Sequence, residues 1–145
     1  MQISSKFTIG VHLLALVDYL GEDEKATSTV LASSIGVNPV IVRNVMRNLK
    51  EAGLISVSQG KSGISLTKTP DQITFYDVCK AVESVKDEGL FHFHENPNPE
   101  CPIGRNIHKA MDSKLERVQR RMEDEMRKIT LADVMTDIHN ELKNE

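Results

Sequence analysis

The residues of this chain best suited to chemistry gather on one face of a helix predicted over residues 39–50. Asn38 is a favourable N-cap, and Pro39 suits the first helical position, where its missing N–H costs nothing. Spacings of i, i+3, i+4 and i+7 place together Val40, Arg43, Asn44 and Arg47. Two guanidinium groups and a carboxamide, without a carboxylate among them, can hydrogen-bond to the phosphates and base edges of DNA.

The same face also has a plainer interpretation, since charged helix faces commonly do no more than contact solvent. The opposite side carries an apolar stripe that we expect to be core, formed by Ile41, Val42, Val45 and Leu49. The helix therefore has the amphipathic pattern of a packed surface helix. Its function depends on the elements that surround it.

The elements before and after this helix predict a winged helix-turn-helix. A first helix is expected over residues 4–20, and a short second one begins after a cap at Thr27 or Ser28. Gly36 suits a tight turn into the third helix, which should end near Gly53. Alternating apolar and polar residues predict strands at 54–58 and 64–67, joined by a Gly-bounded loop. The fold class expected is mainly α with a small β-hairpin.

Two more helices are predicted beyond the hairpin, and after them residues 131–142 form either a final short helix or a frayed end. Thr74 and Asp77 resemble a capping box, which starts a helix over residues 75–85. A long helix opens at Pro102 and carries apolar residues at steps of three and four: Ile103, Ile107, Met111, Leu115, Val118, Met122, Met126 and Ile129. A small domain cannot cover so long a stripe, so a second subunit should. We divide the chain into a DNA-binding domain (1–85), a linking or sensor loop (86–101), and a dimerisation helix with its tail (102–145).

The composition is that of one globular domain with an extension. The chain has 145 residues, of which 39% are hydrophobic, 27% charged and 4% aromatic, and its formal net charge is −3. No apolar run approaches the roughly 20 residues that span a bilayer, and no signal-peptide pattern is present, so we expect a cytoplasmic protein without a membrane partner. From Pro39 to Lys50 there are three cations and no anion, which keeps DNA binding compatible with the acidic total.

The two cysteines cannot supply a four-thiolate metal or iron–sulfur site, so no cofactor is expected. Cys79 shares an apolar face with Val78 and Val82 and should be buried. Cys101 stands before Pro102, at the expected start of the long helix, where the helix N-terminus favours a thiolate. It is either a redox sensor or an unreactive cap residue.

Histidines near this cysteine raise the question of a metal or ligand site. His92 and His94 form a His-x-His pattern, and His108 follows in the long helix. Their spacing to Cys101 matches no recognised zinc pattern. We therefore expect a loop with its histidines in solvent and no metal.

Several motifs, in order, resemble the Rrf2 family of bacterial transcription regulators. They are Ala52-Gly-Leu-Ile, the Gly60–Gly63 turn followed by Leu66, and Ile73-Thr-Phe-Tyr-Asp-Val-Cys-Lys-Ala-Val-Glu83. Ser4-Ser-Lys-Phe and Cys101-Pro-Ile fit as well, so the resemblance spans nearly the whole chain. It implies a homodimeric winged-helix repressor or activator that dimerises through the long helix.

In this family, the third helix and the hairpin tip bind DNA. That implies contacts, on what should be a palindromic operator, from Asn38, Pro39, Val40, Arg43, Asn44, Arg47, Asn48, Gln59, Lys61 and Ser62. Helix-terminus phosphate contacts are expected from Ser5, Lys6 and Thr29. Two features depart from the family pattern. The usual Gly-Gly-aromatic wing is replaced by Gly63-Ile64, and iron–sulfur members carry three cysteines where this chain has only Cys101.

A second function class stays open: a winged-helix module that docks a protein partner, such as a metabolic enzyme, without touching DNA. An enzyme is not expected, because no nucleophile triad, P-loop or dinucleotide-binding glycine pattern is present. Salt-sensitive retardation of promoter DNA would favour the first class, and co-purification of a protein without retardation the second.

Overall fold

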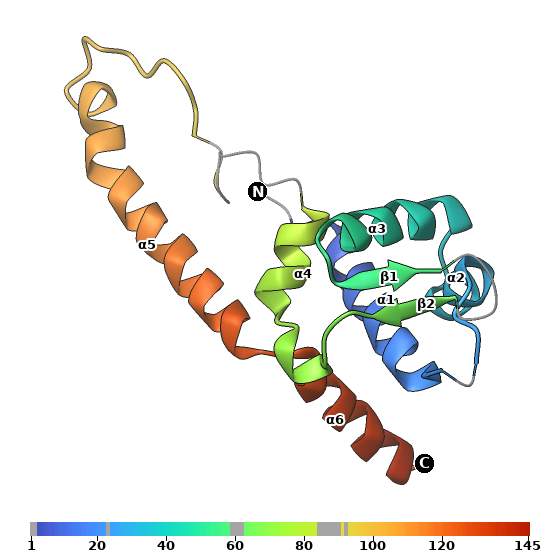
Figure 1. The fold of residues 1–145 in the computed structure, drawn as a ribbon. Coiled ribbons are helices and arrows are strands. Elements are labelled where there is room, and N and C mark those ends of the chain that lie inside the picture. The colour runs from blue at the N-terminus through green and yellow to red at the C-terminus, as the bar shows by residue number, and fades with distance from the viewer. Residues whose placement is uncertain (1–2, 23, 59–62, 84–90, 92) are drawn as a thin grey trace.

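Three helices, a hairpin and three further helices follow one another in the computed structural model, which describes residues 3–22, 24–58, 63–83, 91 and 93–145 (Figure 1). The elements are α1 (Ser5–Leu20), α2 (Ser28–Ile35), α3 (Pro39–Glu51), β1 (Ile55–Val57), β2 (Ile64–Leu66), α4 (Phe75–Val82), α5 (Ile107–Lys128) and α6 (Leu131–Lys143), with 3₁₀ turns η1 (Pro70–Gln72) and η2 (Gly104–Asn106). The predicted fold class, mainly helical with a small hairpin, is confirmed.

Local capping chemistry sets the helix-turn-helix. The Thr27 hydroxyl accepts a hydrogen bond from the Val30 N–H and starts α2. Gly36 ends that helix with a left-handed φ of 77°, which glycine adopts without steric cost. Asn38 then caps α3, its Oδ1 lying 2.8 Å from the Val40 nitrogen. The turn and α3 therefore begin where the sequence predicts.

The hairpin pairs β1 with β2 in antiparallel register, Ile55 opposite Leu66 and Val57 opposite Ile64. At its base, a Cβ on Gly63 would lie 3.0 Å from the Ala26 carbonyl oxygen, so the second strand can approach the α1–α2 connection only with glycine there. The tip, residues 59–62, lies outside the described residues. The DNA contacts expected from Gln59, Lys61 and Ser62 therefore stay predictions.

The core is aliphatic and is shared by α1, α2, α3, α4, the hairpin and α6. From α3 it takes Val42, Val45 and Leu49, each fully buried. Ile41 is 41% exposed, so its expected place in the core stripe is wrong. It lies about 100° around the helix from Val42, beyond the side that α1, α4 and β1 cover.

The predicted capping box at the start of α4 is confirmed. The Thr74 hydroxyl accepts from the Asp77 N–H, and the Asp77 carboxylate accepts from the Thr74 N–H, at 3.1 and 3.0 Å. The helix ends at Val82, three residues before the predicted end, and residues 84–90 lie outside the described part. Both the N–H and the hydroxyl of Ser4 donate to Glu83 Oε1, which joins the start of α1 to the end of α4.

The C-terminal helix returns to the winged domain. The Phe75 N–H donates to the Ile129 carbonyl and the Leu131 N–H to the Ile73 carbonyl, at 2.9 and 2.8 Å, which forms an isolated antiparallel bridge. Leu131 is 2% and Met135 5% exposed. The hydrophobic core of the winged domain thus includes the start of α6, although α1 and α6 are distant in sequence.

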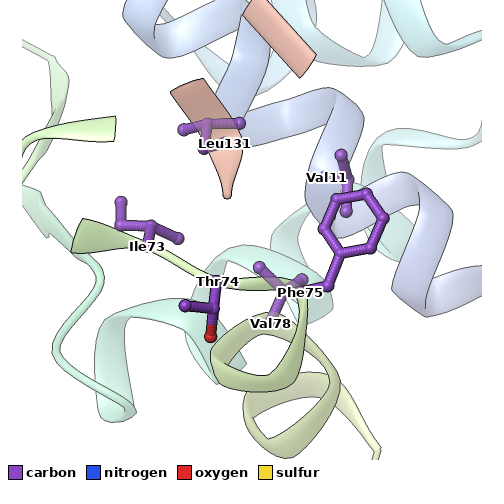
Figure 2. Close-up of a pocket in the computed structure, with 6 residues that line it drawn as sticks. All are labelled: Val11, Ile73, Thr74, Phe75, Val78 and Leu131. Carbon is purple, nitrogen blue, oxygen red and sulfur yellow. The ribbon is translucent and has the colours of Figure 1, made fainter. Parts of the chain in front are cut away.

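A shallow apolar pocket marks this junction, where α1, α4 and α6 meet (Figure 2). Its lining is Val11, Ile73, Thr74, Phe75, Val78 and Leu131. The pocket has no room for a water molecule, and Thr74 uses its hydroxyl in the helix cap. It is a packing crease of the domain and has no features of a ligand site.

We expect α6 to depend on its own capping box, in which Thr130 and Asp133 exchange hydrogen bonds of 3.2 and 2.9 Å. Replacing both by alanine should lower the free energy of unfolding by about 1–3 kcal/mol, because each lost cap leaves backbone donors unpaired. Denaturant unfolding followed by circular dichroism measures this change. Thr136→Ala, at an exposed position in the same helix, is the matched control and should stay within about 0.5 kcal/mol. A neutral double variant would contradict the role of the cap.

The longest helix, α5, has 22 residues, or about 33 Å, and none of them is buried. Its C-terminal half runs beside α4, while its N-terminal half projects away from the winged domain (Figure 1). Within the described residues, no single helix is long and apolar enough to cross a membrane. Helices α2 and α3 meet that test only when taken together, across a bend of 111°.

Candidate DNA-binding surface

The outer face of α3 presents the predicted residues together. Arg43 and Arg47 are exposed, Val40 is 53% exposed, and Asn44 is partly exposed beside them. The Nη2 of Arg47 donates to Asn44 Oδ1 at 2.6 Å. Because Val42, Val45 and Leu49 anchor the opposite side, this face is held outward by the core.

The chemistry of this face suits a DNA groove. Arg43 has no hydrogen-bond or ion-pair partner among the described residues, so its guanidinium is available to phosphate or guanine. The apolar Val40 is the kind of side chain that contacts a thymine methyl group. Glu51 shares the face at the C-terminal end of α3, away from the N-terminal residues that usually enter the groove.

The other predicted DNA contacts lie at helix ends of the same domain. Ser5 and Lys6 are exposed in the first turn of α1, and Thr29 is exposed in the first turn of α2. The side-chain oxygen of Asn38 accepts the hydrogen bond that caps α3, and its side-chain NH₂ group stays available as a donor. Pro39 is exposed and Asn48 half-buried. The exposed positions among them are accessible to DNA phosphates.

The long helix starts later than predicted, so Cys101 lies in the turn before the helix and not at its N-terminus. Helix α5 begins at Ile107, so Cys101 does not stand at its N-terminus. Its carbonyl accepts from the Arg105 N–H at 3.0 Å, and its Sγ accepts from the Gly104 N–H at 3.5 Å. A Cβ on Gly104 would lie 2.6 Å from the Asn98 carbonyl oxygen. With this close approach, residues 98–106 form a compact turn that ends in η2, and no α-helix begins before Ile107.

His94 and His108 contact each other beside this turn. The His108 ring nitrogens lie 3.1 Å from Asp112 Oδ1 and 3.1 Å from the His94 carbonyl oxygen. The rings of His94 and His108 are 5.3 Å apart, and Phe93 packs edge-on against His108. The loop residue His94 is exposed, as expected, although its ring contacts that of His108, which is partly buried at the start of α5; His92 lies outside the described residues. No cluster of three metal-ligating groups occurs in the described ranges.

The second cysteine is inert by its surroundings. Cys79 is buried in α4, as predicted. Burial raises the pKa of its thiol, and the Glu83 and Glu123 carboxylates raise it further. The thiol form is therefore favoured at neutral pH, and the thiolate that reacts with oxidants is scarce.

The apolar stripe of α5 is left incompletely covered. Ile107, Met111, Leu115, Met122, Met126 and Ile129 are half-buried, whereas Val118 is 53% exposed. Ile103 precedes the helix and is 72% exposed, so it does not belong to the helical stripe as predicted. At the C-terminal end, the Arg127 guanidinium lies 4.1 Å from the centroid of the Tyr76 ring and ties α5 to α4.

A helix-turn-helix with an outward basic face, followed by a hairpin, defines a winged helix-turn-helix protein. The comparisons agree. The family model "Rrf2: Iron-dependent Transcriptional regulator" matches residues 3–137. The Bacillus subtilis protein "Putative HTH-type transcriptional regulator YwnA" is 41% identical over 136 residues, which cover 94% of this chain and 98% of that protein.

Solved structures show the same fold. One, described as "a putative DNA binding protein", is 36% identical with a TM-score of 0.73, and the match covers 90% of this chain and 99% of that one. CymR, the global cysteine regulator of B. subtilis, is 18% identical with a TM-score of 0.71, and the match covers 94% of this chain and 97% of that one. The chain therefore belongs to the Rrf2 family, whose members are transcriptional regulators and not enzymes.

Proposed function

We propose that this protein is a homodimeric, sequence-specific DNA-binding regulator that acts in the cytoplasm, most simply as a repressor that occupies a promoter. The observation that carries the proposal is the outer face of α3, where Arg43 and Arg47 are exposed with no carboxylate between them. The helix N-terminus and Val40 face outward with them, so charge, hydrogen-bond donors and an apolar group reach a groove together.

The dimer rests on the stripe of α5. A helix about 33 Å long whose apolar residues are at most half-buried requires a cover, and the winged domain reaches only its C-terminal half (Figure 1). A second copy presents the same stripe, so a two-fold pairing covers both. Two copies of α3 would then reach successive major grooves of a palindromic operator, roughly 34–36 Å apart.

The family description names iron, and the donors of this chain do not fit an iron–sulfur cluster. Such clusters take four ligands, mostly cysteine thiolates. The chain has two cysteines, of which Cys79 is buried as a thiol in α4. Only Cys101 stands in the segment before α5. We therefore propose that this member works without a cluster.

We further propose that Cys101 senses oxidants. It is partly exposed, so an oxidant can reach it, and its Sγ accepts a hydrogen bond from the Gly104 N–H. A peroxide would transfer one oxygen atom to Sγ, forming sulfenic acid and releasing water; a disulfide between subunits is the alternative product. Either product would disturb the turn that leads into the dimer helix.

Thiol labelling of the native protein tests this contrast between the cysteines. We expect Cys101 to react with a maleimide at least about tenfold faster than Cys79, because only Cys101 is accessible and hydrogen-bonded as a sulfur acceptor. Mild peroxide should weaken DNA binding reversibly in the wild type and leave Cys101→Ser unaffected. Cys79→Ser is the control and should respond like the wild type. An unchanged response in Cys101→Ser would exclude Cys101 as the sensor.

Retardation of the protein's own promoter fragment tests DNA binding itself. If the dimer neutralises about four phosphates, raising salt from 50 to 200 mM should weaken binding roughly 100-fold. A fragment of unrelated sequence serves as control and should bind more weakly at every salt concentration. No retardation at 50 mM, together with a co-purifying protein, would instead favour the protein-docking function.

A further inference from the structure

We infer that Asn44 positions Arg47, and that Arg47 in turn reads a guanine in each half-site of the operator. The inference rests on the proposed function and assigns separate roles to two neighbouring residues. Its basis is the 2.6 Å hydrogen bond from Arg47 Nη2 to Asn44 Oδ1, which joins two side chains one turn apart on the outer face of α3.

The hydrogen-bond inventory of Asn44 argues against its reading adenine. A bidentate adenine contact uses both ends of the carboxamide: the oxygen accepts from the adenine amino group, and the NH₂ donates to N7. The oxygen of Asn44 is already engaged by a guanidinium. Adenine would have to place a second donor against that oxygen, beside the positive charge. The NH₂ group of Asn44 stays available for a single contact with a phosphate or base acceptor.

The inventory of Arg47 points the other way. Its guanidinium has five N–H donors, and the bond to Asn44 uses one of them. The remaining donors include a fork that matches the O6 and N7 acceptors of guanine. An arginine side chain loses much rotamer freedom when it binds, and the bond to Asn44 restricts that freedom before DNA arrives. The bond therefore prepares Arg47 for a bidentate contact.

The experiment is selection of binding sites from a random-sequence duplex pool with the full chain and three variants. The wild type should select a two-fold site with a guanine in each half. Arg47→Ala should lose that guanine preference. Asn44→Ala should keep the same preferred base with discrimination reduced about threefold to tenfold, and no adenine preference should disappear. Asn44→Asp, which keeps an acceptor for Arg47, should restore guanine discrimination relative to Asn44→Ala even if total affinity falls.

A modified base identifies the contact directly. Replacing the selected guanine by 7-deazaguanine removes its N7 acceptor, which should weaken the wild type roughly 5- to 150-fold and leave Arg47→Ala unaffected. If Asn44→Ala lost an adenine preference while the guanine preference stayed intact, or if 7-deazaguanine had no effect at any selected guanine, the inference would be overturned. If the wild type selected no sequence and retarded no DNA at low salt, the proposed function itself would fail.

Discussion

Replacing Arg43 and Arg47 together by alanine should abolish operator binding while leaving a folded dimer. Both side chains are exposed on α3 and contribute nothing to the core, and alanine is the stronger helix former. Each well-placed arginine contact is worth about 1–3 kcal/mol, and a dimer loses four of them, so the loss should be at least about 4 kcal/mol, or roughly 10³-fold in affinity. Fluorescence anisotropy with a labelled operator measures the loss, and circular dichroism checks the fold.

The matched control removes two equal charges from another exposed helix face. Arg117 and Arg120 lie on α5, on the side away from its apolar stripe. Their double alanine variant has the same net charge as the α3 variant and should bind the operator within about threefold of the wild type, since distant exposed charges act only through screened fields. Equal binding by the α3 double variant and the wild type would refute the assignment of α3 as the reader.

Placing glutamate at Leu115 and Met122 should convert the proposed dimer into a monomer. Both side chains lie in the half-covered stripe of α5, and burying such a residue at an interface contributes about 1.5–3 kcal/mol. These side chains are already half-buried within one chain, so about half of that energy is available to the dimer; for the four side chains together the loss should be about 3–6 kcal/mol, or roughly 10²- to 10⁴-fold in the dimer dissociation constant. Sedimentation equilibrium measures this, and operator binding should fall with it because the two readers are no longer linked.

The control for this prediction adds glutamate to the opposite side of the same helix. Ser113→Glu with Arg120→Glu introduces two carboxylates at exposed positions and should leave the dimer intact. Because the Leu115 and Met122 positions are only partly covered by the rest of the chain, the monomeric variant should keep its helix content. A variant with both stripe substitutions that sediments as the wild type does would show that another surface holds the subunits together.

Much of the winged domain could be predicted because its signals are local. Asn38 and Pro39 place the start of α3 to the residue, and the Thr74–Asp77 box does the same for α4. The alternation around Ile55 and Ile64 predicts both strands. Caps and short-period patterns act between residues a turn or a pleat apart, so their geometry is set before the domain packs.

The sequence predicted which residues share the outer face of α3, but not the hydrogen bond that joins two of them. Periodicity placed Arg43, Asn44 and Arg47 on one face, and the structure has them there. Periodicity did not show that Arg47 hydrogen-bonds to Asn44, because the rotamer of a side chain depends on its surroundings as well as on its position along the helix. Periodicity also did not show that Ile41 lies outside the core. An apolar residue at the edge of a stripe is buried only if a neighbouring element covers it.

The start of the long helix shows a different limit. Pro102 is compatible with a helix start, and the apolar steps extend back to Ile103, so the pattern alone favours a helix there. The structure instead holds residues 98–106 in a turn, where the backbone of Asn98 closes against Gly104. In the sequence, the only sign of such a close backbone approach is the glycine that it requires. The approach decides whether Cys101 lies at a helix terminus or within a turn.

The sequence by itself determined the order of the helices, the hairpin and the basic face of α3, because these depend on caps, turns and periodicity along the chain. Only the tertiary structure decided that residues 73–75 pair with 129–131, and so that α6 closes the core beneath α1 and α4. Thr130 and Asp133 form a local capping box at the start of α6, whereas no local signal marks the segment against which α6 packs. A contact between segments more than 50 residues apart is selected by the combined burial of many side chains, which no local pattern encodes.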